Sequence, residues 1–468
     1  MTDPEGNSLY ARSETVQPRS VRGRFRSWKF LAMVVLLPWW YLAPFMRWYR
    51  GPGAPDQAIL IDMGGRRAYF FGLEIWPQEI YYLTGILVVA AIALFLVSAL
   101  YGRVWCGFLC WQTVYTDLFV QIERMVIGDR TRRLALDRAP WTLDKLARKG
   151  AVHLMWILIA GSCGIAFTLY FGDAPSMLPA ILTGQESVAV YGAIAVVGGF
   201  CYLLAGFARE QVCLYMCPYS RFQAAMFDEH SLIVGYETWR GEPRGRWRKG
   251  VPFEGRGHCI DCGVCVAVCP TGIDIRKGSQ LGCIGCGLCI DGCDAMMDRV
   301  GLPRGLITWD SIASQAARAQ GETPRHRLVR PRTLVYGLVL AVALGVIGWS
   351  LLGRTTTEMT VLHERALLYV RLSDGSIRNG YVVKIQNKIR SERLFNLTIE
   401  GLEGVRMSVI GGGPPLRVAP DSVGSFTVFV TAAAGIATGR RVPLTFVLRD
   451  VADGSEARAE SLFVGPDR

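Results

Sequence analysis

Charged residues are scarce in this chain of 468 residues, of which only 19% are Asp, Glu, Lys or Arg. Hydrophobic residues make up 51%, and the mean hydropathy is +0.26. A soluble protein of this size carries more charge on its surface. The composition therefore argues against a soluble enzyme and favours a membrane protein.

Cysteine is absent before Cys106 and after Cys293, although the chain holds 14 of them. A secreted disulfide scaffold is small and has cysteines throughout, which excludes that class. The distribution favours metal binding or redox chemistry in the middle of the chain. No C-x-x-C-H sequence occurs, so a covalently attached c-type haem is not expected.

Five apolar segments are long enough to cross a bilayer, which takes about 20 residues. They are 30–46, 80–101, 150–171, 188–208 and 333–353. A polar segment precedes the first, and no small-residue cleavage site follows it. We therefore interpret it as a retained span rather than a signal peptide.

Lys and Arg are unevenly distributed over the connecting segments. Segments 1–29, 102–149 and 209–332 hold six, nine and seventeen, whereas 47–79 holds four and 172–187 none. The positive-inside rule places the first three in the cytoplasm. Residues 354–468 then lie in a bacterial periplasm, and the protein in the inner membrane. This topology explains the net charge of +12, so we expect no nucleic-acid partner.

Residues 354–468 contain short runs of alternating apolar and polar residues, such as 368–372 and 381–385. Turn dipeptides separate such runs at Asp374-Gly375, Asn379-Gly380 and Asp453-Gly454. This pattern predicts the hairpins of a β-sandwich of about 110 residues. With no catalytic or metal pattern in it, we interpret it as a binding or docking module.

The strongest motif is a run of eight cysteines in two matched halves, the only duplication that we find. Each half has the C-x2-C-x2-C-x3-C spacing of bacterial ferredoxins, in which the fourth cysteine binds the other cluster. Two [4Fe–4S] clusters are therefore predicted, one held by Cys259, Cys262, Cys265 and Cys293, the other by Cys283, Cys286, Cys289 and Cys269. The alternative, structural zinc, prefers separated cysteine pairs around one ion.

Two further cysteine pairs follow the second and fourth predicted spans: Cys106 with Cys110, and Cys213 with Cys217. A gap of three residues on a helix places both sulfurs on one face. Both spans run inward, so the four thiols are predicted at a similar depth, where they could serve one metal or redox partner. Met216 could add a thioether to a soft copper(I) site, or only pack.

Free cysteine is also a good small core residue, which is the alternative for these pairs. That alternative is preferred for Cys163 and Cys201, which are isolated within spans. Other polar candidates are assigned structural roles: His153 at a helix end, His258 beside a cluster ligand that it tunes, and Arg209, Glu210 and Arg221 as interfacial anchors or ion pairs.

The strings GRVWCGFLCWQTVYTDLF (102–119) and CLYMCPYSRFQAAMFD (213–228), with the ferredoxin segment, resemble the CcoG family. These cytochrome c oxidase accessory proteins, also called FixG or RdxA, are membrane polyferredoxins related to NapH and NosR. The resemblance implies an immunoglobulin-like C-terminal domain and reduction of copper(II) to copper(I) for assembly of a cbb-type oxidase. Its implied partners are oxidase assembly factors or a copper chaperone or transporter, with an unknown electron donor.

One residue departs from the family pattern: Trp111 follows Cys110, where relatives usually have proline. Proline cannot continue a helix, so whether the helix breaks here as in the relatives is open. Two other functions also stay open at this point. One is a quinol-linked electron-transfer subunit of the NapH or NosR type, and the other is a non-enzymatic scaffold for oxidase assembly.

The expected fold is an α-helical membrane protein with five transmembrane helices, a cytoplasmic ferredoxin segment with two clusters and a periplasmic immunoglobulin-like sandwich. The predicted boundaries are 1–29 for a cytoplasmic tail, 30–208 for four membrane helices, 209–250 for a cytoplasmic connector, 251–300 for the ferredoxin domain, 301–332 for a linker, 333–353 for the fifth helix and 354–468 for the sandwich.

Overall fold

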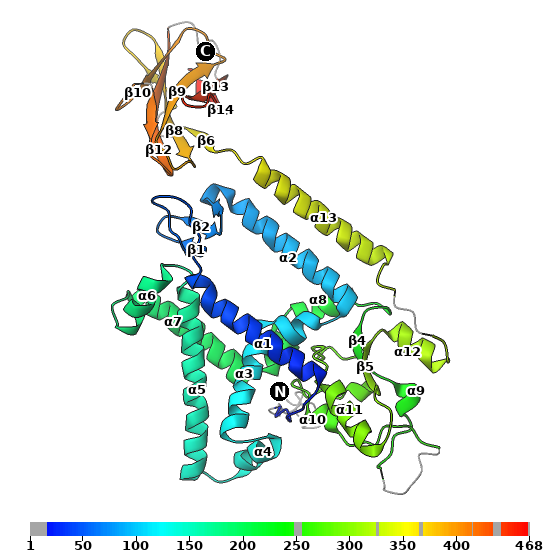
Figure 1. The fold of residues 1–468 in the computed structure, drawn as a ribbon. Helices are drawn as coiled ribbons and strands as arrows, with labels where there is room; N and C mark the ends of the chain where they lie inside the picture. Colours follow the sequence, from blue (N-terminus) through cyan, green and yellow to red (C-terminus); the bar gives the residue numbers. More distant parts are fainter. Residues whose placement is uncertain are drawn as a thin grey trace, which may run out of the picture. The chain divides into compact units, whose positions relative to one another are not determined.

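The computed structural model describes residues 16–247, 255–323, 327–364, 368–413, 415–433 and 441–466. Residues 1–15 of the predicted tail and 251–254 of the predicted ferredoxin domain lie outside these ranges. The chain divides into two compact units, one formed by Met1–Arg50 with Pro55–Ile347 and the other by Gly51–Ala54 with Gly348–Arg468. Each unit is described by itself, with the element labels of Figure 1.

Within the described ranges, five helices are long and apolar enough to cross a membrane, which agrees with the predicted number. They are α1 (Arg24–Leu42) with the 3-10 turn η1 (Ala43–Phe45), η2 (Pro77–Glu79) with α2 (Ile80–Tyr101), α5 (Leu143–Thr168), α7 (Val188–Cys201) with the π-helical η4 (Tyr202–Ala208), and α13 (Pro331–Leu352). The side of the membrane on which each connecting segment lies stays a prediction.

Helix α5 begins seven residues before the predicted span. Thr142 caps it by accepting a hydrogen bond from the backbone N–H of Lys145 at 3.2 Å. An N-cap threonine satisfies one of the free amides of the first turn. The first two turns are polar, so the hydropathy pattern detected only the later part of this helix.

Shorter elements connect these five helices in the first unit. The helices are α3 (Trp111–Val126), α4 (Arg130–Arg138), α6 (Ala174–Leu182), α8 (Tyr219–Met226), α9 (Thr238–Gly241), α10 (Val264–Ala267), η6 (Ile275–Lys277), α11 (Leu288–Val300) and α12 (Ile312–Ala319). Strands β1 (Ile59–Asp62), β2 (Arg67–Phe70) and β3 (Leu73–Ile75) form one antiparallel sheet, and β4 (Ile233–Tyr236) pairs with β5 (Ile307–Asp310) in another.

The β4–β5 pair encloses the cysteine-rich segment, since one strand precedes it and the other follows it. Val234 of β4 and Ile307 of β5 pack in the same buried cluster as Cys259 and Cys293. The pairing therefore joins the two ends of the ferredoxin segment and turns it into a closed, compact body.

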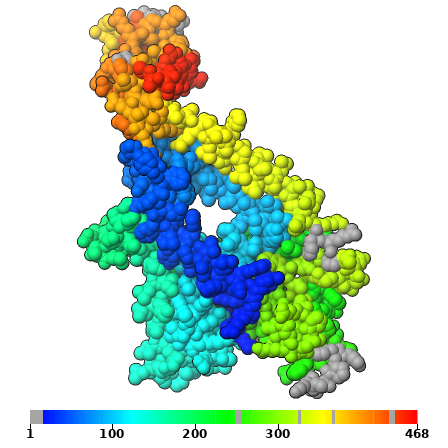
Figure 2. Space-filling model, viewed as in Figure 1, coloured from blue at the N-terminus to red at the C-terminus, as the bar shows by residue number. Residues whose placement is uncertain are grey.

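The start of α1 is held by this ferredoxin segment. The backbone N–H groups of Phe25 and Arg26 donate to the carboxylate of Asp291 in α11, at 3.2 and 2.8 Å. Asp291 thus acts as the helix cap that Gly23, at the N-cap position, cannot supply. Figure 2 shows the blue N-terminal segment lying against the yellow-green ferredoxin segment.

The second unit is a β-sandwich of two antiparallel sheets, in agreement with the prediction. One sheet has the order β10-β12-β8-β6 with β7 paired to β8, and the other β11-β9-β13-β14. The strands are β6 (Thr357–His363), β7 (Val370–Arg371), β8 (Ile377–Asn387), β9 (Arg393–Glu400), β10 (Val405–Val409), β11 (Leu416–Val418), β12 (Ser422–Ala432), β13 (Arg441–Asp450) and β14 (Glu456–Val464).

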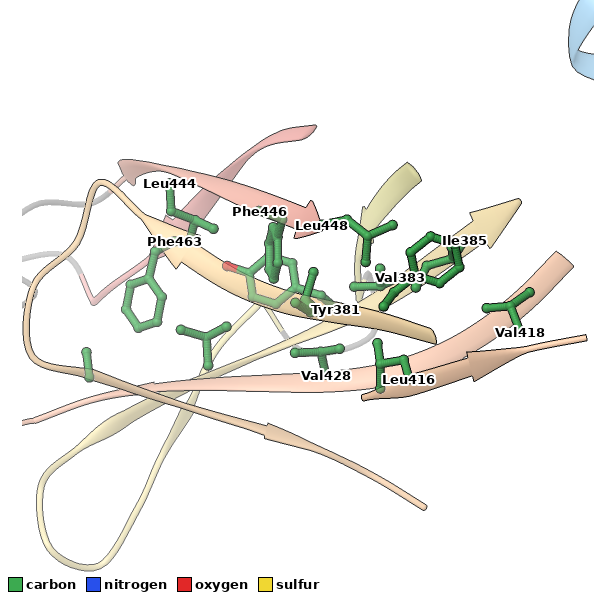
Figure 3. Close-up of a cluster of buried hydrophobic side chains, with 14 of the residues drawn as sticks. Tyr381, Val383, Ile385, Leu416, Val418, Val428, Leu444, Phe446, Leu448 and Phe463 are labelled. Atoms are coloured by element: carbon green, nitrogen blue, oxygen red, sulfur yellow. The ribbon is translucent and has the colours of Figure 1, made fainter. Parts of the chain in front are cut away.

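Alternate residues of the central strands fill the sandwich core. Tyr381, Val383 and Ile385 of β8 point to one face and are fully buried, as the two-residue period of a strand requires. Figure 3 shows Tyr381 beside Phe446 of the opposite sheet, with ring centroids 5.1 Å apart. The Tyr381 hydroxyl donates to the carbonyl of Leu462 at 2.9 Å, so its one polar group is satisfied.

The predicted turn at Asn379-Gly380 is wrong, because both residues lie inside β8. Asn379 is fully buried and bonds across to β14: its amide donates to the carbonyl of Val464 at 2.9 Å, and its oxygen accepts from the Val464 N–H at 2.8 Å. The turn propensity of this dipeptide is overridden by these bonds. The turns at Asp374-Gly375 and Asp453-Gly454 are confirmed, with Gly375 and Gly454 at φ of 80° and 72°.

Candidate functional site

The ferredoxin segment contains two cavities lined by cysteine. The first, of about 350 Å³, is lined by Cys259, Cys262, Cys265 and Cys293. The second, of about 340 Å³, is lined by Cys269, Cys283, Cys286 and Cys289, with Cys265 between the two. We call these four-residue groups set I and set II. In each set, three cysteines come from one half of the motif and the fourth from the other half.

Backbone conformation brings these cysteines together. Gly263 and Gly287 precede α10 and α11 with φ of 66° and 70°, which L side chains rarely adopt. Each glycine turns the chain immediately before a helix that carries cysteines of its half. A Cβ on Gly287 would also collide with the ring of Phe25, so α1 packs directly against set II.

Burial controls the proton affinity of these thiols. It raises the pKa of Cys265 to about 11 and that of Cys286 to about 12, the largest cause in both cases. These two thiols therefore keep their protons at neutral pH until a metal replaces them. Eight cysteines around two cavities fit the thiolate chemistry of iron–sulfur clusters.

Over the ranges that the structure describes, no three or more His, Cys, Asp or Glu side chains are arranged to hold a single metal ion. Zinc would require four ligands around one point. A cubane is held differently, because each of its four thiolates binds a different iron.

The two membrane cysteine pairs form a four-thiol site, made of Cys106, Cys110, Cys213 and Cys217. Burial, together with the charges of the other three thiols, raises the pKa of Cys106 to about 12. Cys213, with a pKa raised by burial to about 11, is likewise influenced by Cys110 and Cys217. The thiol of Cys106 donates to Gln223 Oε1 at 3.2 Å. The structure thus brings together the two pairs, which are more than a hundred residues apart.

The prediction that each pair lies on a regular helix is wrong. Cys106 lies in a π-helical turn, η3 (Trp105–Leu109), and Cys213 in another, η5 (Val212–Met216). The N–H of Cys110 donates to the carbonyl of Trp105 at 2.9 Å, and that of Cys217 to Val212 at 2.8 Å. Such i→i+5 turns are rare and occur mostly at functional sites.

The chain leaves the helix at the second cysteine of both pairs. Cys110 and Cys217 have extended backbones, with ψ of 126° and 110°, and α3 and α8 begin soon after. The break at Cys110 therefore occurs without a proline at Trp111. The packing around the turn, rather than the residue that follows it, fixes this geometry.

The two segments are a structural repeat that the sequence did not reveal. Gly102 and Arg209 each end a long helix with positive φ, 64° and 38°, and the π turns and extended cysteines follow at the same offsets. Equivalent positions differ by 107, as 209 − 102 and 217 − 110 show. The four-thiol site lies where the two copies meet.

The four-thiol site adjoins set II. A Cβ on Gly107 would lie only 3.0 Å from the Cα of Cys286 and 3.0 Å from the carbonyl oxygen of Ile284. Cys106 and Cys213 pack in the same apolar cluster as Cys286 and Cys289. Backbone therefore touches backbone between the two sites, which no local sequence pattern could have indicated.

Two buried cations, Arg103 and Lys29, act on cysteines of both the four-thiol site and set II. Arg103 donates to the carbonyl of Cys283 at 3.0 Å and also to the carbonyls of Leu281 and Ser220, which clamps the ferredoxin segment onto the four-thiol site. Its charge opposes the effect of burial on the pKa of Cys283, Cys106 and Cys213. The charge of Lys29 acts in the same direction on Cys213 and Cys286.

Other candidates lie elsewhere. Met216 is 60% exposed, so the structure gives no support to its role as a ligand. Cys163 and Cys201 are not isolated, since both belong to the core cluster around Tyr115 and Phe119. His153 pairs through Nδ1 with the Tyr202 hydroxyl at 3.0 Å.

The structure also shows the contacts of the charged and titratable residues that the sequence analysis considered. His258 Nδ1 accepts from Arg240 at 2.9 Å, and burial followed by this guanidinium lowers the pKa of the imidazole. Arg209 is paired with Glu123 at 2.6 Å, as an ion-pair role predicts. Glu210 has no ion pair in the described part of the chain, and Arg221 is exposed.

Family models match three parts of the chain. A 4Fe–4S dicluster domain matches residues 208–312, a 4Fe–4S binding domain matches 83–128, and the IG-like fold at the C-terminus of FixG matches 347–466. The second of these matches covers Cys106 and Cys110, which no ferredoxin spacing would have selected.

Three curated proteins are similar over nearly their whole length. Nitrogen fixation protein FixG of Rhizobium meliloti is 45% identical over 91% of this chain and 88% of its own. Protein RdxB and protein RdxA of Cereibacter sphaeroides are 43% and 42% identical, over 99% and 94% of this chain and 98% and 95% of theirs. With its ferredoxin-type cysteine sets and five apolar helices, this chain belongs to the FixG/RdxA family of iron–sulfur membrane proteins, whose chemistry is electron transfer.

Proposed function

We propose that this protein reduces copper(II) to copper(I) at the four-thiol site, with electrons supplied through the ferredoxin segment. Set I would hold cluster I, and set II would hold cluster II. The clusters, when bound, store and release single electrons. The observation that carries the proposal is the contact between Gly107 and Cys286, which places the four thiols directly against set II.

The order of the sites supports an electron path that ends at the four-thiol site. Cys265 lies between the two cavities, so sets I and II share a wall. Cys106 and Cys213 share an apolar cluster with Cys286 and Cys289 of set II, whereas the described cluster that holds the set I cysteines contains none of the four thiols. Electrons entering at either set would therefore leave through set II.

The ligand type of the four-thiol site suits copper better than a harder metal, although three or more of its sulfurs do not converge on one ion in the described structure. Thiolates are soft ligands and favour copper(I) over copper(II), so binding there stabilises the product of reduction. The substrate reaction is balanced by one electron: copper(II) accepts it and becomes copper(I), and each cysteine that binds the ion as a thiolate releases its proton to water. Arg103 and Lys29 offset part of the negative charge that four thiolates would place in this buried region.

The family resemblance extends the proposal to a biological role. Copper(I) would be used in the assembly of a cbb-type cytochrome c oxidase, with an assembly factor, copper chaperone or copper transporter as partner. In this topology the cysteine sets face the cytoplasm and the sandwich faces the periplasm, where it would dock a partner. A role as a scaffold alone would not explain why the four thiols pack against set II.

The test uses the full-length protein, purified without oxygen and reduced with dithionite. Copper(II) should reoxidise the clusters of the wild type and yield copper(I), which a copper(I)-specific chromophore detects. A variant with Cys→Ser at Cys106, Cys110, Cys213 and Cys217 should keep its iron and sulfide and lose copper(I) formation by about tenfold or more. The double variant Cys163→Ser/Cys201→Ser, altered at membrane cysteines outside the site, is the matched control.

A further inference from the structure

A cavity of about 540 Å³ lies between α1, α3, the segment before η5 and the surroundings of set II. Its wall includes Cys213 of the four-thiol site. It also includes Thr271, Ile284 and Leu288, each one or two positions from a set II cysteine. A molecule in this α1–α3 cavity would lie beside both sites at once.

Three residues on the wall of this cavity have a buried side-chain atom without a hydrogen-bond partner in the described structure: Arg124 at Nε, Arg209 at Nη1 and Glu210 at Oε2. Glu210 is 6% exposed, and its Oε2 accepts no hydrogen bond in the described structure. Arg209, next to it on the cavity wall, leaves Nη1 without an acceptor, although its Nη2 and Nε are bonded to Glu123 and Gly206. Unsatisfied buried groups are costly and rare, so they indicate a missing ligand with both a donor and an acceptor.

The backbone supports the same conclusion. Arg209 has φ of 38° and ψ of −111°, a conformation that a residue with a side chain rarely adopts. Strain of this kind persists where the surrounding structure holds a group in a required position. Arg209 and Glu210, at consecutive positions, both line the α1–α3 cavity.

The charges around the cavity exclude a metal cation as the occupant. Lys29, Arg124 and Arg209 line it, and the only carboxylates on its wall are Glu210 and Asp117. Asp117 is already paired with Arg26 at 2.9 Å and Lys29 at 3.6 Å. A neutral molecule with apolar and hydroxyl surfaces fits this mixture better than an ion of either sign.

We propose that the α1–α3 cavity binds the head group of a membrane quinol, the electron donor of this protein. The inference rests on the proposed electron-transfer role. A quinol hydroxyl can accept a hydrogen bond from Arg209 Nη1 and donate one to Glu210 Oε2, which satisfies both atoms.

The reaction balances with Glu210, water and the set II side of the cavity. The quinol gives up two electrons and two protons and becomes a quinone. The electrons are accepted one at a time on the set II side of the cavity. The carboxylate of Glu210 takes the first proton, passes it to water and then takes the second. Lys29 lines the cavity, and its positive charge near set II stabilises an added electron there.

The test measures donor and acceptor reactions separately in the full-length protein, held in lipid nanodiscs without oxygen. Duroquinol should reduce the clusters of the wild type. Glu210→Gln should slow this reaction about 10²-fold, the usual contribution of a proton acceptor. It should also weaken duroquinone binding in calorimetry at least tenfold, while reduction by dithionite and the iron content stay unchanged. Glu229→Gln, at an exposed glutamate, is the matched control.

Each outcome decides one question. A wild type that dithionite reduces but duroquinol does not would overturn the quinol site, as would a Glu210→Gln variant that matches the wild type in rate and binding. Failure of copper(II) to reoxidise dithionite-reduced clusters would instead count against the copper proposal, and it would leave quinol binding and cluster reduction as they were measured.

Discussion

Removing the charge of Arg103 should lower the reduction potential of cluster II and leave that of cluster I nearly unchanged. Arg103 is 6% exposed and donates to the carbonyl of Cys283, a set II residue, at 3.0 Å. A positive charge in this position stabilises the reduced cluster relative to the oxidised one. No comparable contact joins Arg103 to a set I cysteine in the described structure.

The size of the effect follows from Coulomb's law. At about 8 Å and an effective dielectric constant of about 20, two unit charges interact by about 2 kcal/mol. Since about 1.4 kcal/mol corresponds to 59 mV for one electron, Arg103→Met should shift cluster II by roughly 90 mV to more negative potential. Arg103→Lys keeps the charge but loses the forked donor geometry, so its shift should be less than half as large.

The assay is a redox titration of the anaerobic protein followed by EPR, in which the two clusters are separated by their signals. Cluster I serves as the internal control, and the iron content shows whether each variant is intact. Equal shifts of both clusters, or no shift in Arg103→Met, would refute the assignment of this cation to cluster II.

Further predictions concern composition, contact, stability and pH. Anaerobic protein should contain about eight iron atoms, four for each of two clusters; about twelve would assign a third cluster to the four-thiol site and contradict copper there. Gly107→Val should force its side chain against Cys286, slow copper(II) reduction and cost about 1–3 kcal/mol of stability, whereas Gly161→Ala, with open space around it, should do neither. Asn379→Ala removes two bonds to Val464 and should destabilise the sandwich by about 2–4 kcal/mol in calorimetry of the full chain. Burial raises the pKa of Cys286 to about 12, so cluster loading of the apoprotein should release protons and weaken as the pH falls; a pH-independent loading would contradict this.

The sequence predicted those features that depend on regular spacing. Five runs of apolar residues defined five helices, because a bilayer requires a minimum length. The spacing of eight cysteines defined two sets, because the x3 step carries each fourth cysteine to the other half. Apolar residues at every second position, as at Tyr381, Val383 and Ile385, predicted a strand, because successive side chains of a strand point to opposite faces.

Features that depend on contacts between distant segments were not predictable. A π turn differs from an α turn only in which carbonyl accepts the bond, so the residues around Cys106 and Cys213 carry no local signal for it. The dipeptide Asn379-Gly380 favours a turn by itself and becomes strand only because Val464 completes its hydrogen bonds. Glu210 resembled an ordinary interfacial charge until the structure showed its carboxylate to be buried and unpaired.

The cap that Asp291 supplies to α1 has a consequence for biogenesis. The amides of Phe25 and the carboxylate that completes them are separated by 266 positions, so the first membrane helix enters the bilayer long before its cap has been synthesised. Because Asp291 lies between Cys289 of set II and Cys293 of set I, the cap is in place only when the second half of the cysteine motif has folded. Loss of iron would therefore remove the Asp291 cap, and the first turn of α1 would fray although it is far away in the sequence.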